Sequence, residues 1–137
     1  MIRHLLDTCA CIELIRGGRS SELLMARLRR KKVGTVGISA ITLAELQYGV
    51  ARSSAPARNR VALVEFLAPL VVAPFDDAAA SAYGRLRAEL QRAGRPIGPL
   101  DMLIAAHALS LSAVLVTGNE REFRRVTGLT IENWLTK

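Results

Sequence analysis

Short runs of apolar residues alternate along this chain with longer segments whose apolar residues recur at helical spacing. The runs are short enough for buried strands and lie at 2–6, 33–38, 71–73, 113–117 and 129–131. The segments with helical periodicity lie between them, at 9–15, 41–51, 78–93 and 102–111, with two more around 23–28 and 56–70. This alternation predicts an α/β fold in which βαβ units build a parallel sheet with helices on both faces.

Polar residues and glycines mark the expected helix ends. The expected N-caps are Thr8, Ser20 or Ser21, and Asp76. Gly17 and Gly94 follow helical segments and are expected to end them. The helix opened by Ala55-Pro56 carries Val61, Val64, Leu67 and Leu70 at helical spacing.

Length and composition limit the class of protein. The 137 residues fit one domain, 1–137, and a hydrophobic fraction of 50% is incompatible with a disordered chain. No apolar run approaches the roughly 18 residues that span a bilayer. The N-terminus leads directly into a predicted strand and shows no signal peptide, so a cytoplasmic protein without membrane association is expected.

The chain carries a large positive charge. Nineteen Lys and Arg against twelve Asp and Glu give a net charge of +7. An excess of this size in a small domain favours a polyanionic partner, of which nucleic acid is the first candidate. Solubility alone is the competing explanation.

The two cysteines, Cys9 and Cys11, are too close in sequence for an ordinary disulfide. A zinc site would need His4 and His107 as further ligands. Two reduced cysteines on the first helix are the simpler interpretation.

Three acids stand out because their sequence neighbours are apolar: Asp7, Glu45 and Asp101. Each has a structural explanation, since Asp7 suits an N-cap, Asp101 a first helical turn, and Glu45 a capping box with Thr42. Gathered in one pocket, however, the three carboxylates would repel one another. A hard divalent cation removes that penalty, and oxygen ligands favour Mg²⁺ or Mn²⁺. Such a metal ion would suit phosphodiester hydrolysis.

Five segments resemble one known family. They are LLDT at 5–8, SAITLAELQYG at 39–49, GRPIGPLD at 94–101, VTGNEREF at 116–123 and GLTIENW at 128–134. In this order and at these spacings they look like the PIN-domain ribonucleases, and most of all like the VapC toxins of type II toxin–antitoxin pairs. The resemblance covers essentially the whole chain.

The resemblance implies a three-layer α/β/α PIN-like domain with a short, mostly parallel sheet. It also implies Mg²⁺-dependent cleavage of RNA, a small VapB-like antitoxin partner and a homodimer. By position, Asp7, Glu45 and Asp101 match the metal-binding acids. Asn119 stands where many PIN domains carry a fourth acid, and Glu122 is a possible substitute. The GRPIGP segment resembles toxins that cut transfer RNA, with initiator tRNA the favoured target.

Two questions remain open in the sequence. Arg87, Arg92 and Arg95 flank the third acid and could contact RNA phosphates, or could form a solvated helix face. The acids could also act only as helix caps in a non-catalytic nucleic-acid-binding or regulatory module. A DNA flap nuclease fits less well, because the chain is too short for the substrate arches of such enzymes.

Overall fold

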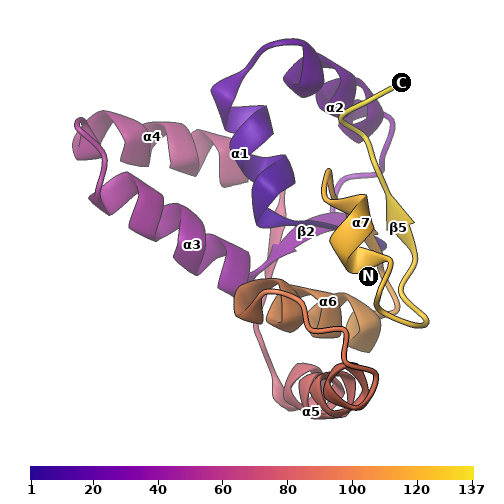
Figure 1. Ribbon diagram of the computed structural model, residues 1–137. Helices are drawn as coiled ribbons and strands as arrows, with labels where there is room; N and C mark the ends of the chain where they lie inside the picture. The colour runs from indigo at the N-terminus through magenta and orange to yellow at the C-terminus, as the bar shows by residue number, and fades with distance from the viewer.

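A five-stranded sheet in which every pairing is parallel runs through the middle of the molecule (Figure 1). The computed structural model describes residues 1–137. The strand order is β3-β2-β1-β4-β5. The strands are β1 (His4–Leu6), β2 (Val36–Ser39), β3 (Val71–Ala73), β4 (Val114–Val116) and β5 (Ile131–Glu132).

Seven helices connect and cover the strands. They are α1 (Thr8–Arg16), α2 (Arg19–Arg29), α3 (Ala40–Ala51), α4 (Pro56–Leu67), α5 (Asp77–Arg92), α6 (Pro99–Leu111) and α7 (Glu120–Phe123). In Figure 1, α5 and α6 lie on one side of the sheet, whereas α1, α2 and α4 lie on the other. None of these helices has both the length and the apolar character needed to cross a membrane.

Alternating strand residues divide the core into two layers. Leu5 and Leu115 point into the cluster formed with α5 and α6, while Leu6 and Val116 point into the cluster formed with α1 to α4. All four side chains are fully buried. Because neighbouring strand residues face opposite sides of a sheet, these apolar strands support a helical layer on each face. The predicted α/β/α architecture is confirmed, and the sheet is parallel throughout.

Two of the three predicted N-caps are wrong. The side chain of Asp7, not Thr8, caps α1, because Asp7 Oδ1 accepts a hydrogen bond of 2.7 Å from the backbone N–H of Ala10. The N-cap of α2 is Gly18, and neither Ser20 nor Ser21 caps it. The hydroxyl of Ser21 instead donates to the carbonyl of Leu14. Asp76 caps α5 as predicted.

Several predicted boundaries also move. The apolar run at 33–38 extends beyond the strand, since β2 begins only at Val36 and Val33 is 85% exposed. The last strand is β5 at 131–132, not 129–131. Helix α6 begins at Pro99, three residues before the predicted start, because proline is well suited to the first turn of a helix. The short helix α7 was not predicted.

The apolar residues spaced along α4 do not all face the core, although Leu67 and Leu70 pack against it. Val61 is 58% exposed and Val64 is 64% exposed, whereas Leu63 between them is buried. Residues three apart share a helix face, so the spacing identified a face but not the side on which the core lies.

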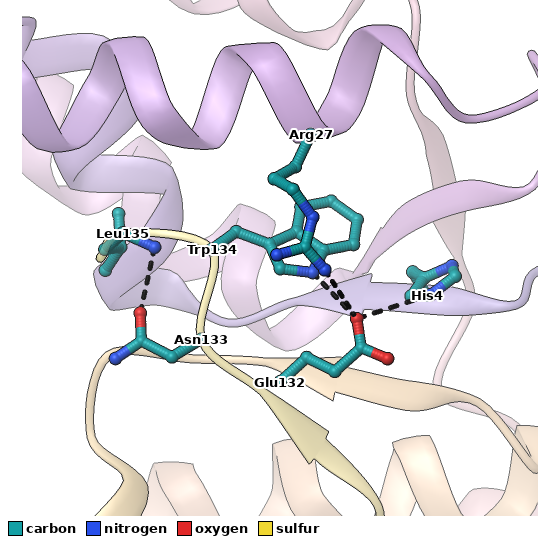
Figure 2. Close-up of polar contacts among 6 residues, drawn as sticks. All are labelled: His4, Arg27, Glu132, Asn133, Trp134 and Leu135. Atoms are coloured by element: carbon teal, nitrogen blue, oxygen red, sulfur yellow. Dashed lines mark hydrogen bonds and ion pairs between the residues drawn. The ribbon is translucent and has the colours of Figure 1, made fainter. Parts of the chain in front are cut away.

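Glu132 makes several of the contacts that hold the C-terminal segment in place (Figure 2). Glu132 Oε1 accepts a hydrogen bond of 2.8 Å from the indole N–H of Trp134 and lies 3.4 Å from Arg27 Nη2. The same oxygen lies 3.9 Å from His4 Nε2. The Trp134 side chain is fully buried between β1 and α2, and it thereby ties the end of the chain to its first strand.

We expect Gly37→Ala to destabilise the protein by about 1–3 kcal/mol, as overpacking typically does. A Cβ at Gly37 would overlap the carbonyl oxygen of Val71 on the paired strand β3. The matched control is Gly84→Ala on α5, where a Cβ meets nothing within 4 Å. That change should stabilise the helix by about 0.5–1 kcal/mol. Urea unfolding of both variants checks the account, and equal stabilities would contradict it.

Candidate active site

The candidate site lies at the carboxyl edge of the sheet, where β1 and β4 pair side by side. Asp7 directly follows β1, and Thr117 directly follows β4. The connection from β1 leads to β2 on one side, while β4 packs on the other side of β1. Ligands of open α/β sheets bind in the crevice at such a reversal of strand order.

Asp7 is a carboxylate with almost no access to water. It is 2% exposed, and one of its carboxylate oxygens accepts the N-cap hydrogen bond of α1. Burial raises its pKa above the usual range, and nearby Glu45 adds to the rise. Hydrogen bonds with the side chain of Thr117 and with Ala10 oppose it. The capping explanation of Asp7 is therefore correct, and the contact with Thr117 is a second polar interaction of the same carboxylate.

Glu45 reaches the same edge of the sheet from α3. Its Oε1 accepts a hydrogen bond of 2.7 Å from Thr8 Oγ1, which also lies 3.2 Å from the Thr42 hydroxyl. The N-cap of α3 is Ser39, so Thr42 and Glu45 do not form a capping box. Glu45 therefore faces the residue that follows Asp7 and not the end of its own helix.

Asp101 lies in the first turn of α6 and has no hydrogen-bond or ion-pair partner in the structure. Its pKa is raised to about 6, first by burial and then by the negative charges of Glu122, Asp7 and Glu45. A helix N-terminus alone would lower the pKa of a carboxylate. The shift in the other direction shows that the loss of solvent and the three neighbouring acids dominate here.

Asn119 and Glu122 are coupled to each other. Asn119 Nδ2 donates to Glu122 Oε2 at 2.8 Å, and the backbone N–H of Gly98 donates to Glu122 Oε1 at 2.7 Å. These hydrogen bonds lower the pKa of Glu122. A Cβ at Gly98 would lie 3.5 Å from Asp101 Oδ2 and 3.6 Å from Glu122 Oε1, so this turn passes beside both carboxylates.

These residues suit a hard divalent cation. They offer only oxygen ligands, and no Lys or Arg pairs with Asp7, Glu45, Asp101 or Glu122. Burial and the negative charges of the neighbouring acids together raise the pKa of Asp101. No three His, Cys, Asp or Glu side chains stand close enough together to hold an ion as they are. The carboxylates are thus neighbours whose side chains would have to converge on a metal.

A buried hydrogen-bond relay connects α6 to the start of α3, and no local sequence pattern indicates it. The Nδ1 atom of His107 on α6 lies 2.8 Å from the Ser39 hydroxyl, which accepts from the backbone N–H of Ile41 in α3. His107 also hydrogen-bonds the backbone of Pro74, and burial lowers its pKa. The imidazole is 1% exposed and packs in the interior. His107 thereby links α6, which carries Asp101, to Ser39, the N-cap of α3, which carries Glu45.

The remaining sequence candidates lie outside this group. Cys9 and Cys11 are free thiols, one exposed and one buried, and no zinc cluster forms with His4 or His107. Arg87, Arg92 and Arg95 are exposed around the end of α5. Arg87 donates to the Tyr83 hydroxyl of its own helix.

A groove of about 580 Å³ opens beside Glu45. It runs between α1 and α3 towards the start of α6, and its lining is mostly apolar. The exposed side chains of Ile12, Tyr48 and Leu100 form part of it, and Arg52 is its one cation. The groove therefore leads from solvent-exposed apolar surface to one of the acids.

Comparison with known proteins agrees with this geometry. The family model of the PIN domain matches residues 4–129. The chain is 42% identical over 134 residues to the "tRNA(fMet)-specific endonuclease VapC" of Shigella flexneri, covering 98% of this chain and 99% of that protein. It is 41% identical over 131 residues to "Ribonuclease VapC2" of Rickettsia felis, covering 96% of this chain and 97% of the relative.

A solved structure shows the same fold. The DNA-bound VapBC of Salmonella typhimurium superposes with a TM-score of 0.92 at 42% identity, covering 98% of this chain and 99% of that one. The match in sequence and structure extends over nearly the full length and agrees with the parallel α/β/α fold described above. This chain belongs to the VapC family of PIN-domain ribonucleases.

Proposed function

We propose that this protein is the toxin of a type II toxin–antitoxin pair and cleaves RNA with Mg²⁺ or Mn²⁺ held by Asp7, Glu45 and Asp101. The observation that carries the proposal is the raised pKa of Asp101, to about 6, in the field of three further carboxylates that have no cation partner. Nothing favours the alternative of a non-catalytic binding module, since the relatives are nucleases and Glu45 caps no helix.

Asp7 and Asp101 would hold the ion most directly. Asp7 Oδ1 caps α1 and the Asp7 carboxylate also hydrogen-bonds Thr117, whereas Asp101 has both oxygens free of hydrogen bonds. Glu45 would complete the set, oriented by its bond from Thr8. When bound, the ion lowers the pKa of a coordinated water and neutralises charge on the phosphoryl group.

Asn119 and Glu122 would act in a supporting role. Glu122 is already engaged by Gly98 and Asn119, which leaves it fewer free lone pairs than Asp101 has. Its negative charge still raises the pKa of Asp101. We therefore assign the role of the fourth acid to Glu122. Asn119 orients the Glu122 carboxylate through its hydrogen bond.

Transfer RNA is the proposed substrate, with initiator tRNA favoured. The support is the similarity over nearly the whole length to a relative named as specific for tRNA(fMet). Arg92 and Arg95, exposed near the turn that leads to Asp101, are available for phosphate contacts, as is Arg87 one turn earlier on α5.

A VapB-like antitoxin is the proposed protein partner, supported by the VapBC complexes among the similar structures. The apolar groove beside Glu45 suits a partner segment that would cover the acids. We also propose a homodimer, for which the exposed Val61 and Val64 of α4 offer apolar surface.

Asp7→Asn and Asp101→Asn should each reduce RNA cleavage by at least about 100-fold, because loss of even an outer contact to a metal ligand costs 10- to 100-fold. Asparagine at position 7 can still cap α1, which separates a catalytic effect from unfolding. Glu65→Gln, an exposed acid on α4, is the matched control and should keep full activity. The measurement is cleavage of initiator tRNA with Mg²⁺ and with EDTA. Full activity of either Asn variant would refute the assignment.

Asp101→Asn should also raise the melting temperature of the metal-free protein, and more at pH 7.5 than at pH 4.5. The pKa of Asp101 in the folded protein, about 6, lies above its ordinary value of 3.8. The charge of Asp101 therefore lowers the stability of the fold progressively between about pH 4 and about pH 6, and the full penalty is present above that range and absent below it. Mg²⁺ at 100 times its Kd should stabilise the unmodified protein by about 2.7 kcal/mol at pH 7.5. Glu65→Gln should respond as the unmodified protein does. A melting temperature indifferent to both pH and Mg²⁺ would count against a metal site.

A further inference from the structure

The end of α2 carries the densest positive charge in the chain. Five of the six residues at 27–32 are basic: Arg27, Arg29, Arg30, Lys31 and Lys32. We call residues 27–32 the basic segment. A helix C-terminus favours cations, but that effect reaches only the last turn and is worth about 0.3–1 kcal/mol. It does not account for cations that continue past the helix end at Arg29.

Only one of these cations is neutralised. Arg27 lies 3.4 Å from Glu132 (Figure 2), whereas no carboxylate lies within ion-pair distance of the other four. Lys31 Nζ packs over the Trp134 ring at 5.3 Å from its centroid. Arg29, Arg30 and Lys32 are exposed to solvent. Apart from the pair of Arg27 with Glu132, the basic segment therefore presents a positive surface with no counter-charge from its own chain.

A pocket of about 200 Å³ gathers part of this charge around apolar atoms. Arg29, Lys31 and Lys32 line it together with Met25, Leu28 and Val33, and no acid does. Val33 is 85% exposed at its rim. Cations around an apolar floor suit a ligand that combines an anionic group with a flat apolar one, as a nucleotide of an RNA chain does.

The pocket lies at the opposite edge of the sheet from the acids. The basic segment precedes β2, and His4 of β1 pairs with Val36 at the start of that strand. Asp7 follows the other end of β1. At about 3.3 Å per residue, three strand residues alone separate the two edges by about 10 Å. One RNA chain can reach both places only if it is long enough to pass around the sheet.

The acidic site itself needs such a second contact. Asp7, Glu45, Asp101 and Glu122 repel phosphates until a metal is bound, so much of the affinity for a polyanion has to come from cations elsewhere. We propose that the basic segment is a second RNA-binding surface, which holds the phosphodiester backbone of a long or folded RNA at the amino-terminal edge of the sheet. This inference rests on the proposed function, in which RNA is the substrate.

The test removes two cations of the pocket without touching the site. Arg29→Gln with Lys32→Gln is compared with Arg58→Gln plus Arg60→Gln, two exposed arginines of α4 that have no ion pair. Both double variants carry Asp101→Asn in the binding assay, so that the probe, initiator tRNA, stays intact. We expect the pocket variant to bind roughly tenfold more weakly at 0.1 M salt. The slope of log K against log salt should fall by about 1.5.

The same pairs are also tested for cleavage with Asp101 restored. The pocket variant should show a raised KM for the tRNA, with kcat within about two-fold of the unmodified protein. The reason is that none of the acids of the candidate active site has been changed. A melting curve verifies folding, and Lys32→Gln alone gives half of the slope change if the double variant is unstable.

Equal tRNA affinity and an equal salt slope in the pocket variant and the α4 control would overturn the proposal. The basic segment would then be a surface for an acidic protein partner instead of RNA. This failure is separate from a failure of the proposed function. In the latter case the unmodified protein itself would not cleave the tRNA.

Discussion

Burial of carboxylates at one edge of the sheet, where their negative charges also repel one another, is the constraint that organises this structure. Asp7 is buried at the end of a core strand, Asp101 has no partner, and Glu45 and Glu122 add their charges nearby. Such a group destabilises the fold near neutral pH, and the raised pKa values of Asp7 and Asp101 express that penalty. A core packed against both faces of the sheet holds the acids in place in spite of it. The relay from His107 to Ser39 fixes the two helices that carry Glu45 and Asp101.

The distribution of charge follows from the same constraint. A protein of net charge +7 keeps its unpaired acids at one edge of the sheet and its densest cations at the other. An RNA nuclease needs both, because the acids that hold a metal cannot by themselves attract a polyanion. The separation allows the chemistry and much of the affinity to be supplied by different surfaces of one small domain.

The sequence predicted the layers and the acids better than it predicted local detail. Apolar runs such as 2–6 identified the strands, because the strands of a parallel sheet covered on both faces consist almost entirely of apolar residues. Apolar sequence neighbours singled out Asp7, Glu45 and Asp101, and the resemblance to the PIN motifs then matched them to metal-binding acids. The cap of α1 was misassigned by one residue, since Thr8 and Asp7 can both cap and only the folded chain shows that Thr8 faces Glu45. The relay of His107 joins residues 68 positions apart, and no local pattern reports such a contact.

The most direct test of the account is a crystal structure of the protein with Mn²⁺, in which anomalous scattering locates the ion. If Asp7 and Asp101 hold the metal, we expect an anomalous peak within about 2.3 Å of oxygen atoms from both residues. This distance is typical of oxygen ligands to hard divalent cations. The side chains of these two acids should have moved together from their present positions, in which no metal cluster exists. A fully occupied ion bound elsewhere, with Asp7 still engaged only as the cap of α1, would contradict it.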